Sequence, residues 1–479
     1  MTDDATLRGV EREIVSRRPE SSIEPTLDRI ATLVSLLGDP HRAFPVIHIT
    51  GTNGKTSTAR MIDALLRERG LRTGRFTSPH LVSMRERICI DGQPLDPEHF
   101  VALYAEILPY IQLTDERHGT PLSFFEVLTG MAFAAFADAP VDVAIVEVGL
   151  GGTWDATNVA DGVVAVVTPV AIDHTRYLGD TVEEIAAEKA GIIKPGALAV
   201  LAQQSLPAAE VLLRRVSEVG ATVAREGIEF GVLERDVALG GQQLTLRGLN
   251  GTYTDVFLPL FGEYQAGNAA CALAAVEGFA GVGDDTPGDP DERAALDPDL
   301  VRQGFAGLRS PGRLEILRRS PTVIADAAHN PAGMAASVTA VTEAFSFARL
   351  VGVLAVSADK DVAGMLDELE PVLSDLVVTR NSADRSMPPE ELAELARDVF
   401  GADRVQVAAR MDDAIELAVT LADDAPETAL PGGGGVLITG SVVTAGDARQ
   451  LLRPGAGTGD AGKPSGGAGR HSFTAADLS

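Results

Sequence analysis

The residues with the clearest chemical meaning are the seven at 51–57, which read GTNGKTS. Gly51 and Gly54 allow the backbone to turn tightly and to approach a phosphate group with no Cβ atom in the way. Lys55 supplies a positive charge for outer phosphates, and the Thr56 hydroxyl can face a Mg²⁺ ion. These residue types at this spacing indicate a site for phosphate groups.

The segments on either side of this loop support that interpretation. The loop follows the apolar run Phe44–Thr50 and precedes a helical pattern that ends near Arg69. Unpaired amide groups at the start of such a helix point at a bound anion, and the helix dipole favours negative charge there. The usual Walker spacing would place a glycine at Ile49, so this loop is shorter and contains Asn53. An ordinary turn is the alternative, but the strand–loop–helix context predicts a nucleoside triphosphate site.

Two polar side chains follow other predicted strands and could bind a metal ion beside this loop. Glu147 ends the predicted strand Asp142–Val148, and His174 lies a few residues after the predicted strand Val163–Thr168. The carboxyl ends of strands are where parallel α/β sheets bind ligands, and hard cations prefer oxygen ligands. Alternatively, Glu147 is a surface residue and His174 is a solvated loop residue. Beside a phosphate-binding loop we favour metal ligation for both.

Four more residues have roles that the local sequence leaves open. Lys189 can simply complement the C-terminus of a helix, and Ser78 fits a Ser-Pro turn. Asp326 follows a predicted strand, where it can accept hydrogen bonds from a ribose or cap a helix. Arg313 lies at a domain junction and can reach a triphosphate or remain on the surface.

Short apolar strands alternate with helical patterns through most of the chain, which predicts a parallel α/β fold. Before residue 309 we expect strands at Pro45–Thr50, Asp142–Val148, Val163–Thr168 and Ala197–Ala202, and helices after the loop and at Phe124–Ala137, Val182–Ala190 and Gly267–Phe279. Arg72–Arg75 is interpreted as a turn. The glycine-separated runs in Val223–Pro259 predict a small antiparallel sheet. An acidic, turn-rich loop is expected at Gly281–Glu292.

A Ser-Pro-Gly break near Gly307–Gly312 marks the predicted domain boundary. Five strands with intervening helices then predict a Rossmann-like sheet, with strands at Thr322–Ala325, Leu350–Val356, Leu376–Thr379, Arg404–Val407 and Val436–Thr439. The sequence after Arg453 is rich in Gly, Ala and Ser without periodicity, which predicts disorder. We therefore divide the chain into a first domain at 1–308, a second at 309–453 and a tail at 454–479.

Composition limits the functional classes. Sixty-eight acidic and 40 basic residues give a formal charge of −28 over 479 residues, without a Lys/Arg block, which disfavours nucleic-acid binding. Cys89 and Cys271 provide no disulfide framework, and the N-terminus has no apolar signal segment. Asp138 and Asp142 interrupt the apolar stretch Val127–Leu150, which argues against a membrane span. We expect a soluble cytoplasmic monomer that binds small molecules and neither nucleic acid nor membranes.

Seven segments occur in the order found in folylpolyglutamate synthase and dihydrofolate synthase: GTNGKTS, TSPHL, VEVGLGGTWDATN, DHTRYLG, AAEKAGIIKPG, SPGRLE and DAAHNP. From about Leu7 to Leu452 the chain resembles this family, which is related to the Mur peptidoglycan ligases. The resemblance implies an ATP-dependent amide ligase that adds L-glutamate to tetrahydrofolates and to dihydropteroate. In such enzymes the γ-phosphoryl group activates a carboxylate as an acyl phosphate, mainly through positioning and charge neutralisation.

The resemblance also implies roles for individual residues. Ser78, Glu147 and His174 look like ligands of Mg²⁺, of which two ions are expected. Lys189 matches a family lysine that CO₂ carbamylates, which turns a cation into an oxygen ligand. The triphosphate and the rest of ATP would contact Asn53, Gly54, Lys55, Thr56, Asn268, Arg313 and Asp326. The resemblance leaves open whether a monovalent cation assists.

The pterin side is expected to involve Pro25, Thr26, Leu27, Ser123, Phe124, Phe125, Glu126, Trp154, Asp155 and Ala156. An aromatic pair such as Phe124 and Phe125 can stack on a flat ring, although phenylalanine in a helix is more often part of the core. Many family members read GKG where this chain has Lys55-Thr56-Ser57. That departure leaves open which hydroxyl faces Mg²⁺.

Two other functions compete with this interpretation. A Mur-type muramyl-peptide ligase would carry a UDP-binding domain before the loop, and 50 residues are too few for one. A nucleotide-dependent switch without ligase chemistry would not need metal ligands at two strand ends and a second ribose-binding domain, and no guanine-specifying NKxD pattern occurs. The folate segments favour the ligase.

Overall fold

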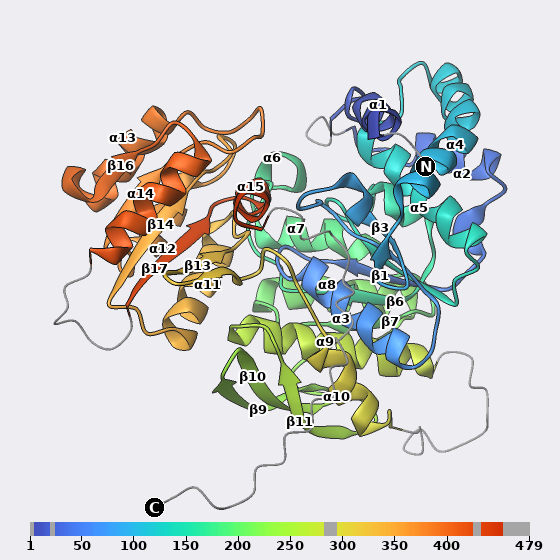
Figure 1. Cartoon of the computed structure of the whole chain (residues 1–479). Coiled ribbons are helices and arrows are strands. Elements are labelled where there is room, and N and C mark those ends of the chain that lie inside the picture. The colour runs from blue at the N-terminus through green and yellow to red at the C-terminus, as the bar shows by residue number, and fades with distance from the viewer. Residues whose placement is uncertain (1–3, 20–23, 282–294, 425–432, 454–479) are drawn as a thin grey trace, which may run out of the picture.

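The computed structural model describes residues 4–19, 24–281, 295–424 and 433–453. Within them the chain forms three sheets with helices packed against them, which confirms the predicted α/β class. Figure 1 shows the sheet of the C-terminal part, in orange and red, beside the larger N-terminal sheet, with the small antiparallel sheet in green below. No helix in these four ranges is long and apolar enough to cross a membrane.

The largest sheet has eight strands, and β2, β5, β1, β6, β7 and β8 run parallel. Its order is β4 (Gln93–Pro94), β3 (Ile88–Ile90), β2 (Thr73–Phe76), β5 (Val143–Glu147), β1 (Val46–Thr50), β6 (Gly162–Val167), β7 (Leu198–Leu201) and β8 (Thr222–Arg225). β3 and β4 continue the sheet antiparallel to β2.

The prediction of a turn at Arg72–Arg75 was wrong, because Thr73–Phe76 forms the buried strand β2. Gly74 lies within this strand, and its backbone is paired with β5. A Cβ atom at Gly74 would lie 2.6 Å from the Phe136 ring, so this glycine allows a helix to pack closely on the strand. Tertiary packing, not turn geometry, explains the residue.

Apolar side chains cover both faces of the central strands, as buried parallel strands require. Ile47 and Ile49 of β1 pack with α3 (Lys55–Glu68), α9 (Glu263–Ala280) and α10 (Pro298–Ala306), whereas Val46 packs with α5 (Phe124–Asp138). The other helices of this part are α1 (Asp4–Val15), α2 (Asp28–Leu36), α4 (Pro97–His118), α6 (Thr175–Leu178), α7 (Val182–Lys189) and α8 (Leu206–Val219), with 3₁₀ turns η1 (Pro40–Arg42), η2 (Met84–Arg87), η3 (Ala156–Val159) and η4 (Ala190–Ile192).

The predicted antiparallel sheet is confirmed from Gly231 to Leu258 and packs against α9, but the start of the predicted segment, Val223–Arg225, belongs to β8 and pairs parallel with β7 in the large sheet. It consists of β9 (Gly231–Ala238), β10 (Gly241–Arg247) and β11 (Thr252–Leu258). The helical pattern predicted for Gly267–Phe279 lies inside α9, which begins four residues earlier at Glu263. This arrangement fixes the start of α9 between the small sheet and the large one.

The C-terminal sheet has six strands in the described residues, whereas the sequence predicted five. Its order is β12 (Glu315–Arg319), β13 (Thr322–Ala325), β17 (Gly434–Thr439), β14 (Arg349–Leu354), β15 (Asp375–Val378) and β16 (Val405–Val407). β12 was missed because three of its five residues are charged, which is typical of an edge strand and leaves no apolar alternation. The helices are α11 (Pro331–Ala344), α12 (Val362–Leu369), α13 (Pro389–Phe400), α14 (Met411–Asp423) and α15 (Val442–Leu452), with η6 (Ala402–Arg404).

Two predictions lie outside the described residues: the acidic loop beyond Gly281 and the tail at 454–479. The two larger sheets are built from residues 46–225 and 315–439, and the predicted boundary at residue 308 lies in the short segment between α10 and β12. The division into domains stays a prediction.

Candidate active site between the two large sheets

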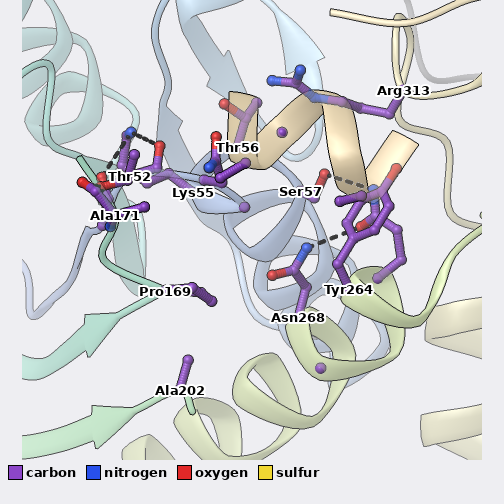
Figure 2. A pocket seen from close by; sticks show the side chains of 18 of the residues that line it. Thr52, Lys55, Thr56, Ser57, Pro169, Ala171, Ala202, Tyr264, Asn268 and Arg313 are labelled. Carbon is purple, nitrogen blue, oxygen red and sulfur yellow. Dashed lines mark hydrogen bonds between the residues drawn. The ribbon is translucent and has the colours of Figure 1, made fainter. Parts of the chain in front are cut away.

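The order of strands explains where a ligand can bind. β1 and β5 are neighbours, and the chain after β1 crosses to β2 on one side of this pair whereas the chain after β5 crosses to β6 on the other side. A crevice forms at the carboxyl ends of strands where the connections diverge in this way. A cavity of about 1120 Å³ lies here, lined by the loops after β1, β5 and β6, by α9 and by residues of the C-terminal part. Figure 2 shows Lys55 and Thr56 at the start of α3, with Tyr264 and Asn268 of α9 nearby and Arg313 extending toward the same space.

The loop after β1 requires both of its glycines. Gly51 has a φ of 142° and Gly54 a φ of 92°, which residues with a Cβ atom rarely adopt. A Cβ atom at Gly51 would overlap the Thr168 hydroxyl, and one at Gly54 would lie 2.5 Å from Asn268 Oδ1. The loop is therefore packed between the strand end after β6 and α9, and α3 begins directly after it at Lys55.

Two lysines meet at one carbonyl oxygen of this loop. Lys55 Nζ donates to Gly51 O at 3.0 Å and to Thr52 O at 3.1 Å, and Lys189 Nζ donates to Gly51 O at 2.9 Å. Burial lowers the pKa of both amines, and the nearby Lys55 charge helps to lower the pKa of Lys189 to about 7. The structure thus places the side chain of Lys189, which the local sequence left as a helix-end residue, against the loop at 51–57.

Glu147 lies next to Thr56 and Ser78. Thr56 Oγ1 donates to its two carboxylate oxygens at 2.9 and 3.0 Å, and the Ser78 backbone amide lies 3.3 Å from Oε2. Glu147 is 1% exposed. Burial raises the pKa of its carboxyl group, and the nearby Lys55 charge opposes that effect. The Thr56 hydroxyl and the Glu147 carboxylate are hard oxygen donors, which suit Mg²⁺.

His174 lines the same cavity, but its ring contacts other residues. His174 Nε2 lies 3.5 Å from Lys360 Nζ and 3.9 Å from Asp173 Oδ2. Burial lowers the pKa of His174 to about 4, although Asp173 opposes the shift. Across the described ranges, no group of three or more His, Cys, Asp and Glu side chains is arranged to hold a metal ion. Metal binding by His174 stays a prediction.

The residues predicted to contact the rest of ATP approach from three elements. Asn268 of α9 donates to Gln265 at 3.1 Å, and Gln265 in turn donates to Ser57 of α3 at 3.4 Å. Arg313 lines the cavity from the linker before β12, and its charge acts on Lys55 and Glu147. All of these groups face the cavity, so the sequence-based set lies together.

Asp326 also lines the cavity, but neighbouring groups already hydrogen-bond to its carboxylate. It accepts from the Leu314 and Ala328 amides at 3.0 Å each and from the Ser337 hydroxyl at 2.6 Å. These bonds fix the turn after β13 and connect it to α11 and to the segment before β12. Ribose binding by Asp326 stays a prediction.

Three residues that bridge the two parts of the chain were not predicted as site residues: Asp173, Asn330 and Lys360. Lys360 pairs with Asp173 at 2.7 Å, and the Asn330 amide donates to Asp173 at 3.0 Å. Burial alone would raise the pKa of Asp173, but the charges of His174 and Lys360 bring it below its usual range. The position of Lys360 shortly after β14 was the available sequence signal, because strand ends form the site edge.

The residues predicted for the pterin side lie outside the lining of this cavity, among the described residues. Phe125 is close to the loop after β5, since a Cβ atom at Gly149 would lie 2.6 Å from its ring. The Arg87 guanidinium lies 4.9 Å from the centre of the buried Phe124 ring. Both phenylalanines pack with the core around α5, as the alternative interpretation expects. A pterin role for them stays a prediction.

The other pterin-side residues have local partners. Ser123 and Glu126 form a capping box at the start of α5, and Glu126 also pairs with Arg29 at 3.0 Å. The Trp154 amide lies 3.3 Å from Glu188 Oε1, and Ala156 begins η3. In the segment Pro25–Leu27, the Thr26 hydroxyl accepts from the Asp28 amide at 3.1 Å.

Asp155 belongs to a buried hydrogen-bonded chain that reaches β1. Its carboxylate accepts from the Thr157 hydroxyl at 2.5 Å, and the same hydroxyl lies 2.9 Å from His48 Nε2. Burial raises the pKa of Asp155 to about 6 and, with the nearby Lys194 charge, lowers the pKa of His48 to about 3. The folded protein therefore keeps His48 neutral.

The buried, neutral His48 should make the stability of the folded protein sensitive to acid. Between about pH 6.5 and pH 3 the unfolded state protonates His48 and the folded state does not, so acid favours unfolding. The variant His48→Gln removes this titration. The free energy of unfolding of wild type minus that of the variant should therefore decrease by about 2 kcal/mol from pH 7 to pH 5. Urea unfolding at both pH values measures it. A difference that does not change with pH would contradict the assignment.

Comparisons with known proteins identify the family. The Mur ligase middle domain matches residues 49–276, and the Mur ligase glutamate ligase domain matches residues 312–442. A dihydrofolate synthase/folylpolyglutamate synthase of Mycobacterium tuberculosis is 52% identical over 466 residues, which is 94% of each chain. The chain belongs to this family. A Bacillus subtilis relative of the same name is 31% identical and matches 92% of this chain and 98% of its own.

Solved structures of family members have the same fold. The Mycobacterium tuberculosis folylpolyglutamate synthase complexed with ADP and AMPPCP has a TM-score of 0.87 at 52% identity, covering 94% of this chain and 98% of its own. Escherichia coli FolC in complex with DHPP and ADP has a TM-score of 0.79 at 30% identity, with coverage of 93% and 97%. The resemblance inferred from the seven segments is thus confirmed over most of the chain.

Proposed function

We propose that this protein is an ATP-dependent amide ligase that adds L-glutamate to reduced folates and to dihydropteroate. The observation that carries the proposal is the meeting of Lys55, Thr56 and Glu147 at one edge of a cavity between two sheets. Relatives that share 52% and 31% of their residues with this chain are named for both activities. One site would serve both, because each reaction couples a carboxylate to the amine of glutamate.

The chemistry follows from the need for a leaving group. The substrate carboxylate attacks the γ-phosphorus of ATP, the bond to the β-phosphate oxygen breaks, and ADP leaves. The glutamate amine then attacks the acyl phosphate, loses a proton and expels phosphate. Lys55 and the amides at the start of α3 would bind and orient the triphosphate, since phosphoryl transfer depends on positioning and charge neutralisation.

The residues around Glu147 fit Mg²⁺, which would neutralise charge on the phosphates when bound. Glu147 and Thr56 would hold the ion through oxygen atoms that already lie together, and the hydroxyl of Ser78, which lines the same cavity, would be a further ligand. His174, on the same cavity wall, remains the candidate for a second ion. Carbamylation of Lys189 would add an oxygen ligand, and an amine whose pKa is about 7 has a large neutral fraction that can react with CO₂.

Substrate binding on the pterin side is supported by position. Phe125 lies against the loop that follows β5 and Glu147, so a pterin near this ring would lie close to the cavity edge. The Escherichia coli relative whose fold this chain shares was solved with DHPP and ADP. A monomeric state, a cytoplasmic location and assistance by a monovalent cation stay predictions.

Phosphate release provides the test. Purified protein is incubated with ATP, Mg²⁺ and glutamate plus either dihydropteroate or tetrahydrofolate, and phosphate and the folate product are measured. We expect release that requires both the folate and glutamate, with one amide formed for each phosphate. UDP-linked muramyl peptide replaces the folate in the control for a Mur-type activity. No release with either folate substrate would contradict the proposal.

A further inference from the structure

The phosphate-binding loop is fixed from two sides. Within the N-terminal part, the Thr52 amide donates to Pro169 O and its hydroxyl donates to Ala171 O, both at 3.0 Å. From the C-terminal part, Asn330 contacts the next residue of the loop, Asn53. Two adjacent loop residues are thus attached to different parts of the chain.

Asn53 and Asn330 form a reciprocal amide pair. Asn330 Nδ2 donates to Asn53 Oδ1 at 3.2 Å, and Asn53 Nδ2 donates to Asn330 Oδ1 at 3.4 Å. Asn330 Nδ2 also donates to Asp173 Oδ2 at 3.0 Å, while Oδ1 accepts from the Gly333 amide at 2.8 Å and caps α11. Asn330 is only 3% exposed. Both donor hydrogens and both acceptor positions of this amide have partners.

The partners also determine the orientation of the Asn330 amide. If its oxygen and nitrogen were exchanged, the oxygen would face the Asp173 carboxylate and the NH₂ group would face the Gly333 N–H. Two favourable contacts would become repulsive, which is costly for a buried group. One orientation is therefore fixed, and it connects the loop, Asp173 and the start of α11.

We propose that Asn330 is a positioning residue that aligns the phosphate-binding loop with the C-terminal part through Asn53 and Asp173. By holding the start of α11 at the loop, it places a second helix N-terminus beside the cavity, where Ala332 and Gly333 are part of the lining. This inference rests on the proposed function in one respect only, which is that ATP is the nucleotide bound. The conformation of the loop at 51–57 and the position of the C-terminal part are then coupled through Asn330. Because both contact the nucleotide site, this coupling should strengthen nucleotide binding.

Asn330→Asp is the informative variant. Aspartate has nearly the same size and still accepts from the Gly333 amide, so the cap of α11 remains. It cannot donate to Asn53 or Asp173, and it places a second carboxylate beside Asp173. We expect the Kd for ATP with Mg²⁺, measured by calorimetry without folate, to rise at least about tenfold, equivalent to about 1.4 kcal/mol. KM for ATP should rise similarly, while KM for the folate stays within about twofold.

A matched control distinguishes positioning of the loop by Asn330 from the general effect of weakening any contact between the N-terminal and C-terminal parts. Glu343 of α11 pairs with Arg235 of β9 through both carboxylate oxygens, and Glu343 itself is not part of the cavity lining among the described residues. Glu343→Gln weakens this other contact between the parts. Its Kd for ATP should stay within about twofold of wild type. An increase as large as that of Asn330→Asp would overturn the proposal.

A double variant tests the hydrogen bond itself. Asn330→Asp combined with Asp173→Asn reverses donor and acceptor and removes the clash of two carboxylates, so it should also fold if the single variant does not. Recovery of at least part of the lost ATP affinity supports the proposal. Wild-type affinity in the single variant, or no recovery in the double variant, would overturn it. Wild type that binds ATP without ligating folates would refute only the proposed function.

Discussion

Lys55→Ala is expected to reduce the rate of ATP-dependent glutamate ligation by about 10³-fold or more, equivalent to about 4 kcal/mol of transition-state stabilisation. Lys55 begins α3, and its ammonium group is held by two carbonyl oxygens of the loop that would receive the triphosphate. Charge neutralisation is a main source of catalysis in phosphoryl transfer, and no neutral side chain replaces it. Phosphate release at saturating folate and glutamate measures the effect.

The fold should survive this change. Burial lowers the pKa of the Lys55 ammonium group, which means that the folded protein bears a cost for holding the charge. Thermal unfolding of Lys55→Ala should therefore occur at or above the wild-type temperature. Lys194→Ala is the control, because Lys194 Nζ bonds to Asn158 O outside the cavity lining and should leave the rate within about threefold. Retained turnover in Lys55→Ala would remove Lys55 from the phosphate site.

Lys189→Ala is expected to abolish ligation to a similar extent, about 10³-fold. Lys189 is 4% exposed and its amine lies 2.9 Å from Gly51 O, so any oxygen ligand formed on it would be at the loop. Because its pKa is lowered to about 7, the neutral amine that reacts with CO₂ becomes more abundant as pH rises through 7. Carbon-13 NMR with labelled bicarbonate should detect one carbamate in wild type and none in the variant.

Lys189→Arg distinguishes the two interpretations of this lysine. Arginine keeps the positive charge at the end of α7 but cannot form the carbamate. It should be as inactive as Lys189→Ala, and added short carboxylic acids should restore part of the activity to Lys189→Ala only. Full activity of either variant would show that Lys189 is an ordinary helix-end cation.

Prediction from sequence worked best where local pattern and tertiary role coincide. The loop at 51–57 was recognisable because glycine, lysine and hydroxyl residues must be contiguous to surround a phosphate. Strands β1, β5 and β6 were recognisable because strands buried on both faces are continuous apolar runs. β2 and β12 were missed because their residues make sense only beside α5 and at a sheet edge, respectively.

The amino-acid sequence by itself determined the α/β class, the glycine-rich loop between β1 and α3 and the family, since each of these is recognised from short contiguous segments of the chain. Only the tertiary structure decided that Lys189 meets Gly51 and that Asn330 and Lys360 meet Asp173. Those partners are between 138 and 187 positions apart. Their contacts depend on the order of strands and on how the C-terminal part packs over the loop, which no local pattern specifies.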